Sequence, residues 1–392
     1  MKVVKIFLIY LSVAFTASVL IVLYELQCFT VGTKQHRTSV ECLHRNWHKT
    51  STDKSSKTIR NPLILYWDYP WHVRRAGDPE GTKIGVCETT YNRNMLEKAD
   101  AVVFHYTVVN GRDIPWRHYR HPKQIFVWWS GEAPPVLQNE NYQLDVFDGF
   151  FNWTWTYRRD ADVLRNYGYR GDLLKSVEKG KDAIDKIIAK KKRLAIWVVS
   201  QCDYTEGAKK RIRFAKRLAR AGVKFTAFGK CFVQALPRSN EMRAIVQQHK
   251  FYLAFENAIH CTDYITEKFW NNGLFSDTVP VVWGPKKEDL LEVAPLDSFI
   301  FAEDFETPEK LAEYLLFVDK NDEEYRKYFR WREDPNITDA MMIEMTRERY
   351  PDLNIQTPPK TICDKLLYNR TSKTIRSLLN EFWDRNPPDC IV

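Results

Sequence analysis

The chain has 392 residues, of which 44% are apolar, and it carries a formal net charge of +9 at neutral pH. This apolar fraction is too high for a protein that is disordered along most of its length, and the length exceeds what one ordinary core serves, so about two domains are expected. Eight cysteines are too few for a small disulfide scaffold, and no cysteine or histidine cluster has the spacing of zinc ligands, which argues against a structural metal site.

The first element is an uncharged apolar run of 19 residues from Ile6 to Tyr24, long enough to cross a membrane as a helix. Two lysines precede the run and a glutamate follows it. The positive-inside bias therefore predicts a cytoplasmic tail at 1–5, a transmembrane signal-anchor at 6–26 and a lumenal remainder. A cleaved signal peptide is the alternative, but its apolar core is usually shorter and no clear small-x-small cleavage site follows.

A stem is expected next, because residues 27–60 are polar and lack apolar periodicity. Asn-x-Thr sequons at Asn152, Asn336 and Asn369 would be usable only on the lumenal side. The same oxidising compartment favours disulfides beyond the stem, although spacing does not fix their pairing. A lumenal domain meets no nucleic acid, so the positive charge points to the phosphates of a small substrate or to acidic lipid headgroups.

Short apolar runs rich in β-branched and aromatic residues follow the stem in two series. They predict buried parallel strands at 63–67, 101–106 and 124–129, and then at 194–200, 223–228, 251–255, 279–283 and 299–301. Helical patterns alternate with the second series at 206–221, 264–275 and 308–318. This alternation predicts an α/β fold with ligands beyond the carboxyl ends of the strands.

A charge-dense segment at 176–193 lies between the two series and is predicted to be the boundary between domains at 61–175 and 194–350. It includes a short pattern typical of a surface helix. Residues 351–392 are expected to form an extension that packs back on both domains. The chain contains neither a GxGxxG nor a GxxxxGK[ST] loop, so neither a dinucleotide oxidoreductase nor a P-loop NTPase is supported.

The stretch KFYLAFENAIHCTDYITEKFWNNGLFSDTVPVVWGP carries the most chemical information. It predicts a buried strand, a loop with Glu256 and Asn257, and a helix whose first turn holds Tyr264, Glu267 and Lys268. A helix N-terminus suits phosphate, while a glutamate and a lysine beside it can bind ribose hydroxyls and a diphosphate. The pattern favours a nucleotide site, although capped helices with surface charges are also common without one.

This stretch resembles the signature of the α1,3/4-fucosyltransferases, in which FYLxFENS and DYITEK[LF]W precede VPVVxGP. FFNWTWTYRRDAD, AIWVVS and FGKC are similar to further motifs of that family, in the same order, and the resemblance spans about 61–350. The link before Asp263 is one residue longer than in vertebrate members, and Asn271-Asn272-Gly273 replaces the usual Arg-Asn-Ala. These departures put acceptor preference in doubt, but not donor use.

The resemblance implies a GT-B glycosyltransferase with two Rossmann-like domains and a cleft between them. The first domain would receive the acceptor sugar and the second would bind GDP-fucose. Tyr264, Glu267 and Lys268 fall on donor-binding positions of the family, and Arg211 falls on its phosphate-contacting arginine, with Arg213 as the alternative. Glu256 and Asn257 complete the predicted donor-binding set.

Transfer from β-linked GDP-fucose to an α-linked product is an inversion, which requires a carboxylate that takes the proton of the acceptor hydroxyl. Glu132, in VWWSGEAP, follows a predicted buried strand and matches the glutamate that the family uses as this base. Glu256 is the alternative, because it also ends a strand at the cleft. In this interpretation Lys268, Arg211 and the helix N-terminus stabilise the departing GDP.

Asp160-Ala161-Asp162 is a DxD triplet, which holds a divalent cation in metal-dependent transferases. Here it lies beside two arginines in the first domain, so structural carboxylates in salt bridges are the preferred interpretation. No metal ligand and no tightly bound cofactor are predicted, GDP-fucose is the co-substrate, and a divalent cation could stimulate activity without being required.

The sequence thus predicts a single-pass type II Golgi enzyme that attaches fucose in α1,3 linkage to GlcNAc of glycoprotein or glycolipid glycans. One alternative keeps the fold and uses another nucleotide sugar. The other is an inactive relative that acts as a lectin or an assembly partner, but the loss of Glu132 or Lys268 that would mark it is not found. The motifs do not choose between an N-acetyllactosamine antenna, LacdiNAc and the N-glycan core as acceptor.

Overall fold

The computed structural model of the chain describes residues 60–74, 81–109, 114–115, 120–139, 144–232, 237, 239–345, 357–382 and 390. The predicted cytoplasmic tail, the transmembrane segment and nearly all of the stem lie outside these residues. Among the residues described, no helix combines the length and the apolar character that crossing a bilayer requires.

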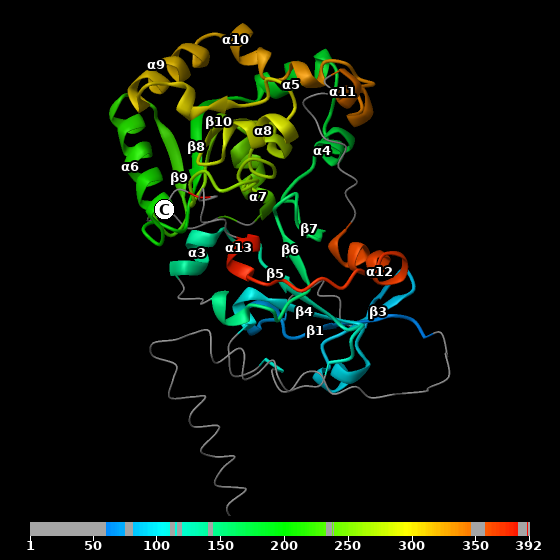
Figure 1. Ribbon diagram of the computed structural model, residues 1–392. Coiled ribbons are helices and arrows are strands. Elements are labelled where there is room, and N and C mark those ends of the chain that lie inside the picture. The colour runs from blue at the N-terminus through cyan, green and yellow to red at the C-terminus, as the bar shows by residue number, and fades with distance from the viewer. Residues whose placement is uncertain are drawn as a thin grey trace, which may run out of the picture.

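Two mainly parallel sheets organise the described chain, each with its own helices (Figure 1). The first sheet, at the bottom of Figure 1, has the order β2-β3-β1-β4-β5-β6-β7, and β2 alone in it pairs antiparallel to its neighbour. Its strands are β1 (Leu63–Tyr66), β2 (Lys83–Ile84), β3 (Cys87–Thr90), β4 (Ala101–His105), β5 (Ile125–Trp129), β6 (Trp153–Thr156) and β7 (Val163–Leu164).

The three strands predicted in this sheet are confirmed as β1, β4 and β5, with ends shifted by at most one residue. They are almost entirely buried on both faces, and such strands are recognisable as apolar runs. The strands β2, β3, β6 and β7 were not predicted. The sequence of β3, CETT, is largely polar, whereas the alternation of tryptophan and threonine in β6 could have identified that strand.

The second sheet is wholly parallel, in the order β12-β11-β10-β8-β9. Its strands are β8 (Arg193–Val198), β9 (Phe225–Phe228), β10 (His249–Phe255), β11 (Val279–Trp283) and β12 (Ile300–Phe301). All five were predicted, with ends shifted by at most two residues. The helices around it are α4 (Arg170–Ser176), α5 (Lys181–Ala189), α6 (Glu206–Arg220), α7 (Ser239–Gln247), α8 (Lys287–Val293), α9 (Pro308–Asp319), α10 (Asp322–Lys327) and α11 (Asp339–Met345).

Helix α6 brings the chain close to the edge of the sheet where ligands are expected. It begins after Thr205, whose hydroxyl accepts a hydrogen bond from the Ala208 N–H at 3.0 Å. A Cβ atom on Gly207 would lie 2.4 Å from the carbonyl oxygen of Asn257. Because only glycine fits there, the first turn of α6 packs directly on the loop after β10.

The segment 176–193 is not a free linker between domains. It contains α5, whose Ile184 and Ile187 are buried in the same hydrophobic cluster as Trp197 of the second sheet. A helix with its apolar side in that core belongs to the second domain. The chain therefore passes between the domains earlier, between the end of β7 and the start of α4.

The prediction of an α-helix at 264–275 is wrong. This segment consists of turns and one short 3₁₀ helix, Leu274–Ser276. Several of its backbone hydrogen bonds span five residues, from Asn272 to Glu267, from Leu274 to Phe269 and from Phe275 to Trp270, at 2.9 to 3.0 Å. The loop is therefore wider than an α-helix, and the site lacks the helix dipole that the sequence suggested.

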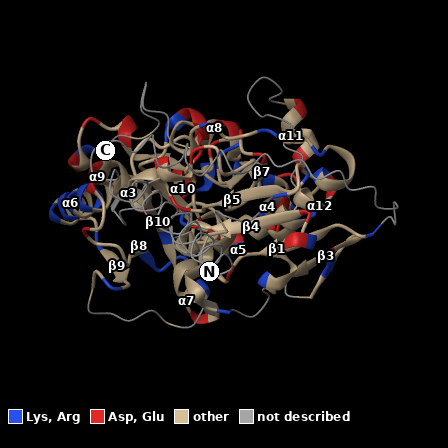
Figure 2. Ribbon diagram, turned by 60° about the horizontal axis from the view of Figure 1, so that its bottom comes forward, with Lys and Arg blue, Asp and Glu red and all other residues tan. Residues whose placement is uncertain are grey.

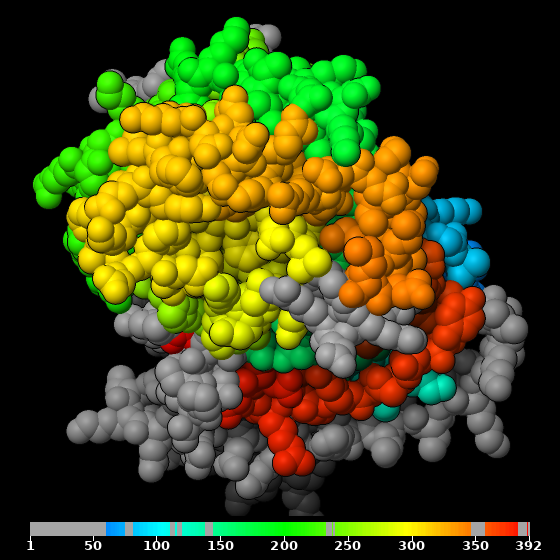
Figure 3. Space-filling view, turned by 90° about the horizontal axis from the view of Figure 1, so that it is seen from above, coloured from blue at the N-terminus to red at the C-terminus, as the bar shows by residue number. Residues whose placement is uncertain are grey.

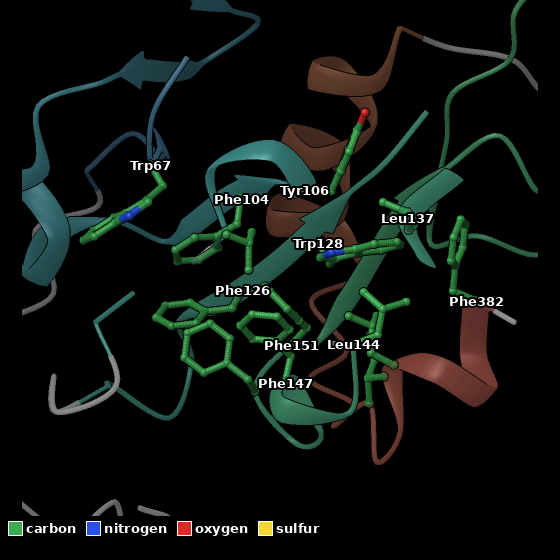
Figure 4. Close-up of a cluster of buried hydrophobic side chains, with 14 of the residues drawn as sticks. Trp67, Phe104, Tyr106, Phe126, Trp128, Leu137, Leu144, Phe147, Phe151 and Phe382 are labelled. Atoms are coloured by element: carbon green, nitrogen blue, oxygen red, sulfur yellow. The ribbon is translucent and has the colours of Figure 1, made fainter. Parts of the chain in front are cut away.

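The C-terminal residues return to the first domain through α12 (Pro358–Tyr368) and α13 (Leu378–Phe382). A disulfide joins Cys363 to Cys87, and the Phe382 ring packs on Trp128, with ring centroids 4.7 Å apart (Figure 4). Seen from above, the red C-terminal segment runs along the border of the second domain, drawn in yellow and orange (Figure 3). The other disulfides pair Cys202 with Cys231 and Cys261 with Cys390.

The three predicted glycosylation sites differ in accessibility. Asn336 and Asn369 are exposed, but Asn152 is only 1% exposed. Its side chain accepts a hydrogen bond from the Phe126 N–H at 2.8 Å and donates one to the carbonyl of Lys373 at 2.7 Å. A glycan on this nitrogen would have to displace the Lys373 carbonyl from a buried position, so the sequence-based assignment of Asn152 is corrected to a structural role.

We expect this difference to appear when the chain is produced in a glycosylating eukaryotic host. Removal of N-glycans should increase the gel mobility of the wild type, and Asn336→Gln and Asn369→Gln should each reduce that change. Asn152→Gln should leave it intact. A smaller mobility change in folded Asn152→Gln protein would contradict the structural assignment.

Candidate active site

Two glutamates from different domains lie at the carboxyl ends of their strands. Glu132 comes shortly after β5, and its backbone N–H donates to the hydroxyl of Ser130 at 3.1 Å. Glu256 directly follows β10. Carboxyl ends of parallel strands are where α/β proteins bind ligands, so both residues occupy the expected edge of their sheets.

Tyr264 connects the two domains at this edge. Its hydroxyl lies 3.1 Å from the Glu132 carboxylate and 3.0 Å from the side-chain oxygen of Asn257. The ring packs on Tyr157, with centroids 4.9 Å apart, and the whole residue is 2% exposed. The side chain of Glu132 is therefore held from across the domain boundary.

Beside Tyr264, a compact cluster surrounds the carboxylate of Glu256, which is 2% exposed. This carboxylate accepts hydrogen bonds from the backbone N–H of Thr266 at 3.0 Å, from the Thr266 hydroxyl at 2.6 Å and from Lys268 Nζ at 2.8 Å. Lys268 Nζ also lies 3.3 Å from Glu267, whose side chain is 46% exposed. The lysine, itself 15% exposed, thus has one buried and one accessible carboxylate as partners.

The charges of this cluster act on one another. Burial raises the pKa of Glu132 above its ordinary value, against the opposing effects of Lys268 and the hydrogen bond from Tyr264. Burial alone would lower the pKa of Lys268, but Glu256 and Glu267 raise it above the ordinary value. The site therefore combines a carboxylate of increased basicity with a lysine that stays cationic at neutral pH.

Arg211, the predicted phosphate contact, is buried beside the cluster of Glu256 and Lys268. It is 2% exposed in α6, and its guanidinium donates to the carbonyls of Phe255 at 2.8 Å and Gln201 at 2.6 Å. Its side chain is thus used to fix the loops after β10 and β8. The alternative, Arg213, is exposed on α6, which stands out as a run of basic residues in Figure 2.

Two further side chains support the site and were missed from the sequence. The side-chain oxygen of Gln201 accepts a hydrogen bond from the Asn257 amide, and the Thr205 hydroxyl donates to the Asn257 carbonyl. Both lie in the loop between β8 and α6. Their position after a predicted buried strand was the available signal, because such loops meet at one edge of a parallel sheet.

The DxD triplet is held by basic side chains, as the sequence interpretation expected. Asp160 accepts two hydrogen bonds from Arg158, at 2.9 and 2.6 Å. Asp162 accepts from the Thr154 backbone N–H at 2.9 Å and pairs with Lys373 at 3.0 Å. In the part of the chain that the structure describes, no group of three or more His, Cys, Asp or Glu side chains could hold a metal ion.

Comparison with known proteins identifies the family. A family model described as "Glycosyltransferase family 10 (fucosyltransferase) C-term" matches residues 188–381, and one described as "Fucosyltransferase, N-terminal" matches residues 59–168. The 4-galactosyl-N-acetylglucosaminide 3-alpha-L-fucosyltransferase FUT6 of Homo sapiens is 35% identical over 281 residues, which cover 69% of this chain and 73% of that protein. The chain belongs to glycosyltransferase family 10, the fucosyltransferases.

Other members of the fucosyltransferase family are similar over much the same length. The 3-galactosyl-N-acetylglucosaminide 4-alpha-L-fucosyltransferase FUT3 of Bos taurus is 39% identical over 292 residues, covering 72% of this chain and 74% of that protein. A crystal structure of an alpha1,3-fucosyltransferase with GDP-fucose aligns with a TM-score of 0.46 at 16% identity, covering 80% of this chain and 98% of that one. The family predicted from the sequence motifs is confirmed.

A second inter-domain contact of this fucosyltransferase lies next to Tyr264. The Arg159 guanidinium pairs with Asp263 at 2.6 Å, with Asp289 at 3.2 Å and with Glu292. The backbone N–H of Arg159 also donates to Asp263 at 2.8 Å. One first-domain arginine thus holds three carboxylates of the second domain and fixes the residue before Tyr264.

We expect Arg159→Gln to destabilise the fold by about 1 to 3 kcal/mol, because it leaves partly buried carboxylates without their cation. Arg217→Gln is the matched control. Arg217 pairs with Glu309, and both side chains are about half exposed, so the loss of Arg217 should cost much less stability than the loss of Arg159. Thermal unfolding of the two variants measures the difference, and equal losses of stability would show that Arg159 does not clamp the domains.

Proposed function

We propose that this fucosyltransferase transfers L-fucose from GDP-fucose, with inversion, to the 3-hydroxyl of GlcNAc in glycoprotein or glycolipid glycans. The proposal is supported above all by the contact of Glu132 with Tyr264, which brings a carboxylate of the first domain to the cationic cluster of the second. The choice of acceptor is supported by the names of the relatives FUT6 and FUT3, which are fucosyltransferases acting on galactosyl-N-acetylglucosaminides.

In this proposal the donor lies against the second domain. Lys268 would contact the diphosphate, since it is cationic and keeps an accessible partner in Glu267. Glu267 would accept hydrogen bonds from the ribose hydroxyls. The donor site would also be supported by buried side chains that are hydrogen-bonded to other groups of the protein, namely those of Arg211, Asn257 and Glu256.

The reaction follows as a single displacement. The acceptor oxygen attacks C1 of fucose while its proton passes to the carboxylate of Glu132, and the bond between C1 and the diphosphate oxygen breaks. GDP leaves with the electron pair of that bond, and the charge of Lys268 stabilises it. Asp160 and Asp162 take no part, since their carboxylates are paired with Arg158 and Lys373.

The finer architecture and the location belong to the same proposal. Two mainly parallel sheets with an active site at their facing edges are consistent with a GT-B arrangement. The apolar run at 6–26 would anchor the enzyme in the Golgi membrane with type II topology, and the described domains would then face the lumen. The disulfides found among the described residues fit such an oxidising compartment.

We expect Glu132→Gln to lower kcat by about 10²- to 10⁴-fold, the usual contribution of a general base, and to leave the Kd for GDP unchanged. The assay is transfer of labelled fucose to N-acetyllactosamine by the purified full-length chain, with calorimetry for GDP binding. Glu309→Gln, at an exposed ion pair on α9, serves as the control. A variant that keeps kcat within a few-fold of the wild type would overturn the assignment.

We expect Lys268→Ala to raise the Kd for GDP by about 10- to 100-fold, since it removes a charged contact to the diphosphate. Lys268→Gln, which can still bond Glu256, should show a similar loss and so separates the missing charge from disruption of the cluster. Lys287→Ala, at an exposed pair with Asp304, should bind GDP normally. Unchanged GDP affinity in both Lys268 variants would exclude the proposed diphosphate contact.

A further inference from the structure

We propose that the exposed side of helix α6 binds a linear sulfated polysaccharide, a partner distinct from the donor and the acceptor of the transfer reaction. The helix has seven lysines and arginines between residues 209 and 220 and a single acidic residue, Glu206. Figure 2 shows it as a mainly blue ribbon at one side of the molecule. The inference depends on the proposed lumenal location of the domains, but not on the proposed reaction.

The exposed basic residues of α6 fall on one side of the helix. Most successive members are three or four residues apart, so their side chains follow one another along the helix axis. We call this set the α6 basic face, and its members are Lys209, Arg213, Lys216, Arg217 and Arg220. The face is about 16 Å long and begins near the turn that packs on the loop after β10.

Only part of the charge on the α6 basic face is neutralised within the protein. Lys209 pairs with Glu206 at 2.6 Å, and Arg217 pairs with Glu309 at 2.5 Å. All four of these side chains are about half exposed, so an external anion can still reach both cations. The other three members of the face have no carboxylate within salt-bridge distance in the part of the chain that the structure describes.

The stability of the helix does not account for this arrangement. Like charges four residues apart, such as those of Lys216 and Arg220, repel each other and destabilise a helix. The helix dipole favours cations only at the C-terminal end, whereas the α6 basic face already begins at Lys209, near the N-terminal end. The repulsion along the face is relieved when an anion binds across it.

The apolar side of α6 is packed inside the second domain, which distinguishes this helix from one that binds a membrane. Ala215 and Leu218 are buried in the hydrophobic cluster of the second sheet, and Ile212 and Phe214 pack against the same cluster. A helix that docks on a bilayer needs its apolar side free to enter the headgroup region. The helix α6 therefore offers charge alone, which suits a soluble polyanion.

A line of cations about 16 Å long matches an anion that is itself extended. Sulfated polysaccharides carry repeated negative charges along the chain, and runs of lysine and arginine bind such polymers. Arg213 and Arg220 can each donate two parallel hydrogen bonds to a sulfate group, as guanidinium groups do to phosphate. A nucleic acid is the other extended polyanion, but a domain that faces the lumen, as proposed above, does not meet one.

The test is calorimetric binding of a heparin oligosaccharide of defined length to the purified full-length chain over a series of salt concentrations. The variant is Lys216→Gln/Arg220→Gln, which leaves Arg213 intact because the sequence interpretation named it as an alternative phosphate contact. Lys186→Gln/Lys190→Gln is the matched control, since it removes two exposed lysines with the same spacing from α5 and the residue after it.

We expect the Lys216→Gln/Arg220→Gln variant to bind the oligosaccharide about fivefold more weakly, or weaker still, because it loses two exposed ionic contacts. The slope of log K against log salt should decrease in magnitude by about two, since fewer counterions are released. The control variant should stay within about twofold of the wild type. Both variants should keep the wild-type kcat and Kd for GDP, which reports that they are folded.

Three results would overturn this inference. The wild type could fail to bind the oligosaccharide, or both double variants could lose affinity equally, which would mean that net charge alone governs binding. Tighter binding to vesicles containing phosphatidylserine, or to a single-stranded RNA, would assign the α6 basic face to a membrane or a nucleic acid instead. A chain that binds heparin but transfers no fucose would overturn the proposed function and leave this inference standing.

Discussion

The carboxylate of Glu256 imposes the constraint on which the site depends. Glu256 directly follows strand β10, which is buried along its whole length, and the side chain of Glu256 is 2% exposed. An ionised carboxylate in such a place is tolerated only with a cation and hydrogen-bond donors around it. The segment after Asp263 supplies both, because Thr266 gives its N–H and hydroxyl and Lys268 gives its ammonium group.

This constraint shapes the surrounding fold. Since the Thr266 N–H and Lys268 must face Glu256, the chain there forms wide turns in place of the predicted α-helix. With this backbone path, the Tyr264 side chain faces Glu132 of the first domain, and the Asp263 carboxylate forms a salt bridge with Arg159. The disulfide between Cys261 and Cys390 ties the beginning of this segment to the C-terminal residues. The two domains are thus joined at the residues that the proposed reaction uses.

The sequence was informative where one kind of residue dominates a segment. The apolar runs at β10 and β11 located the second sheet, and the motif residues Glu132 and Lys268 were placed at one site. What could not be predicted depends on partners distant in the chain. The local sequence does not show that Arg211 is buried and donates to two backbone carbonyls, or that the Asn152 side chain bonds the C-terminal segment. Both depend on tertiary contacts.

The central claim is that Lys268, compensated by Glu256 in the free enzyme, supplies the cation for a departing diphosphate. A crystal structure of the full-length chain with GDP bound tests it most directly. The account predicts a diphosphate oxygen within hydrogen-bonding distance of Lys268 Nζ. A diphosphate bound away from Lys268 would contradict it.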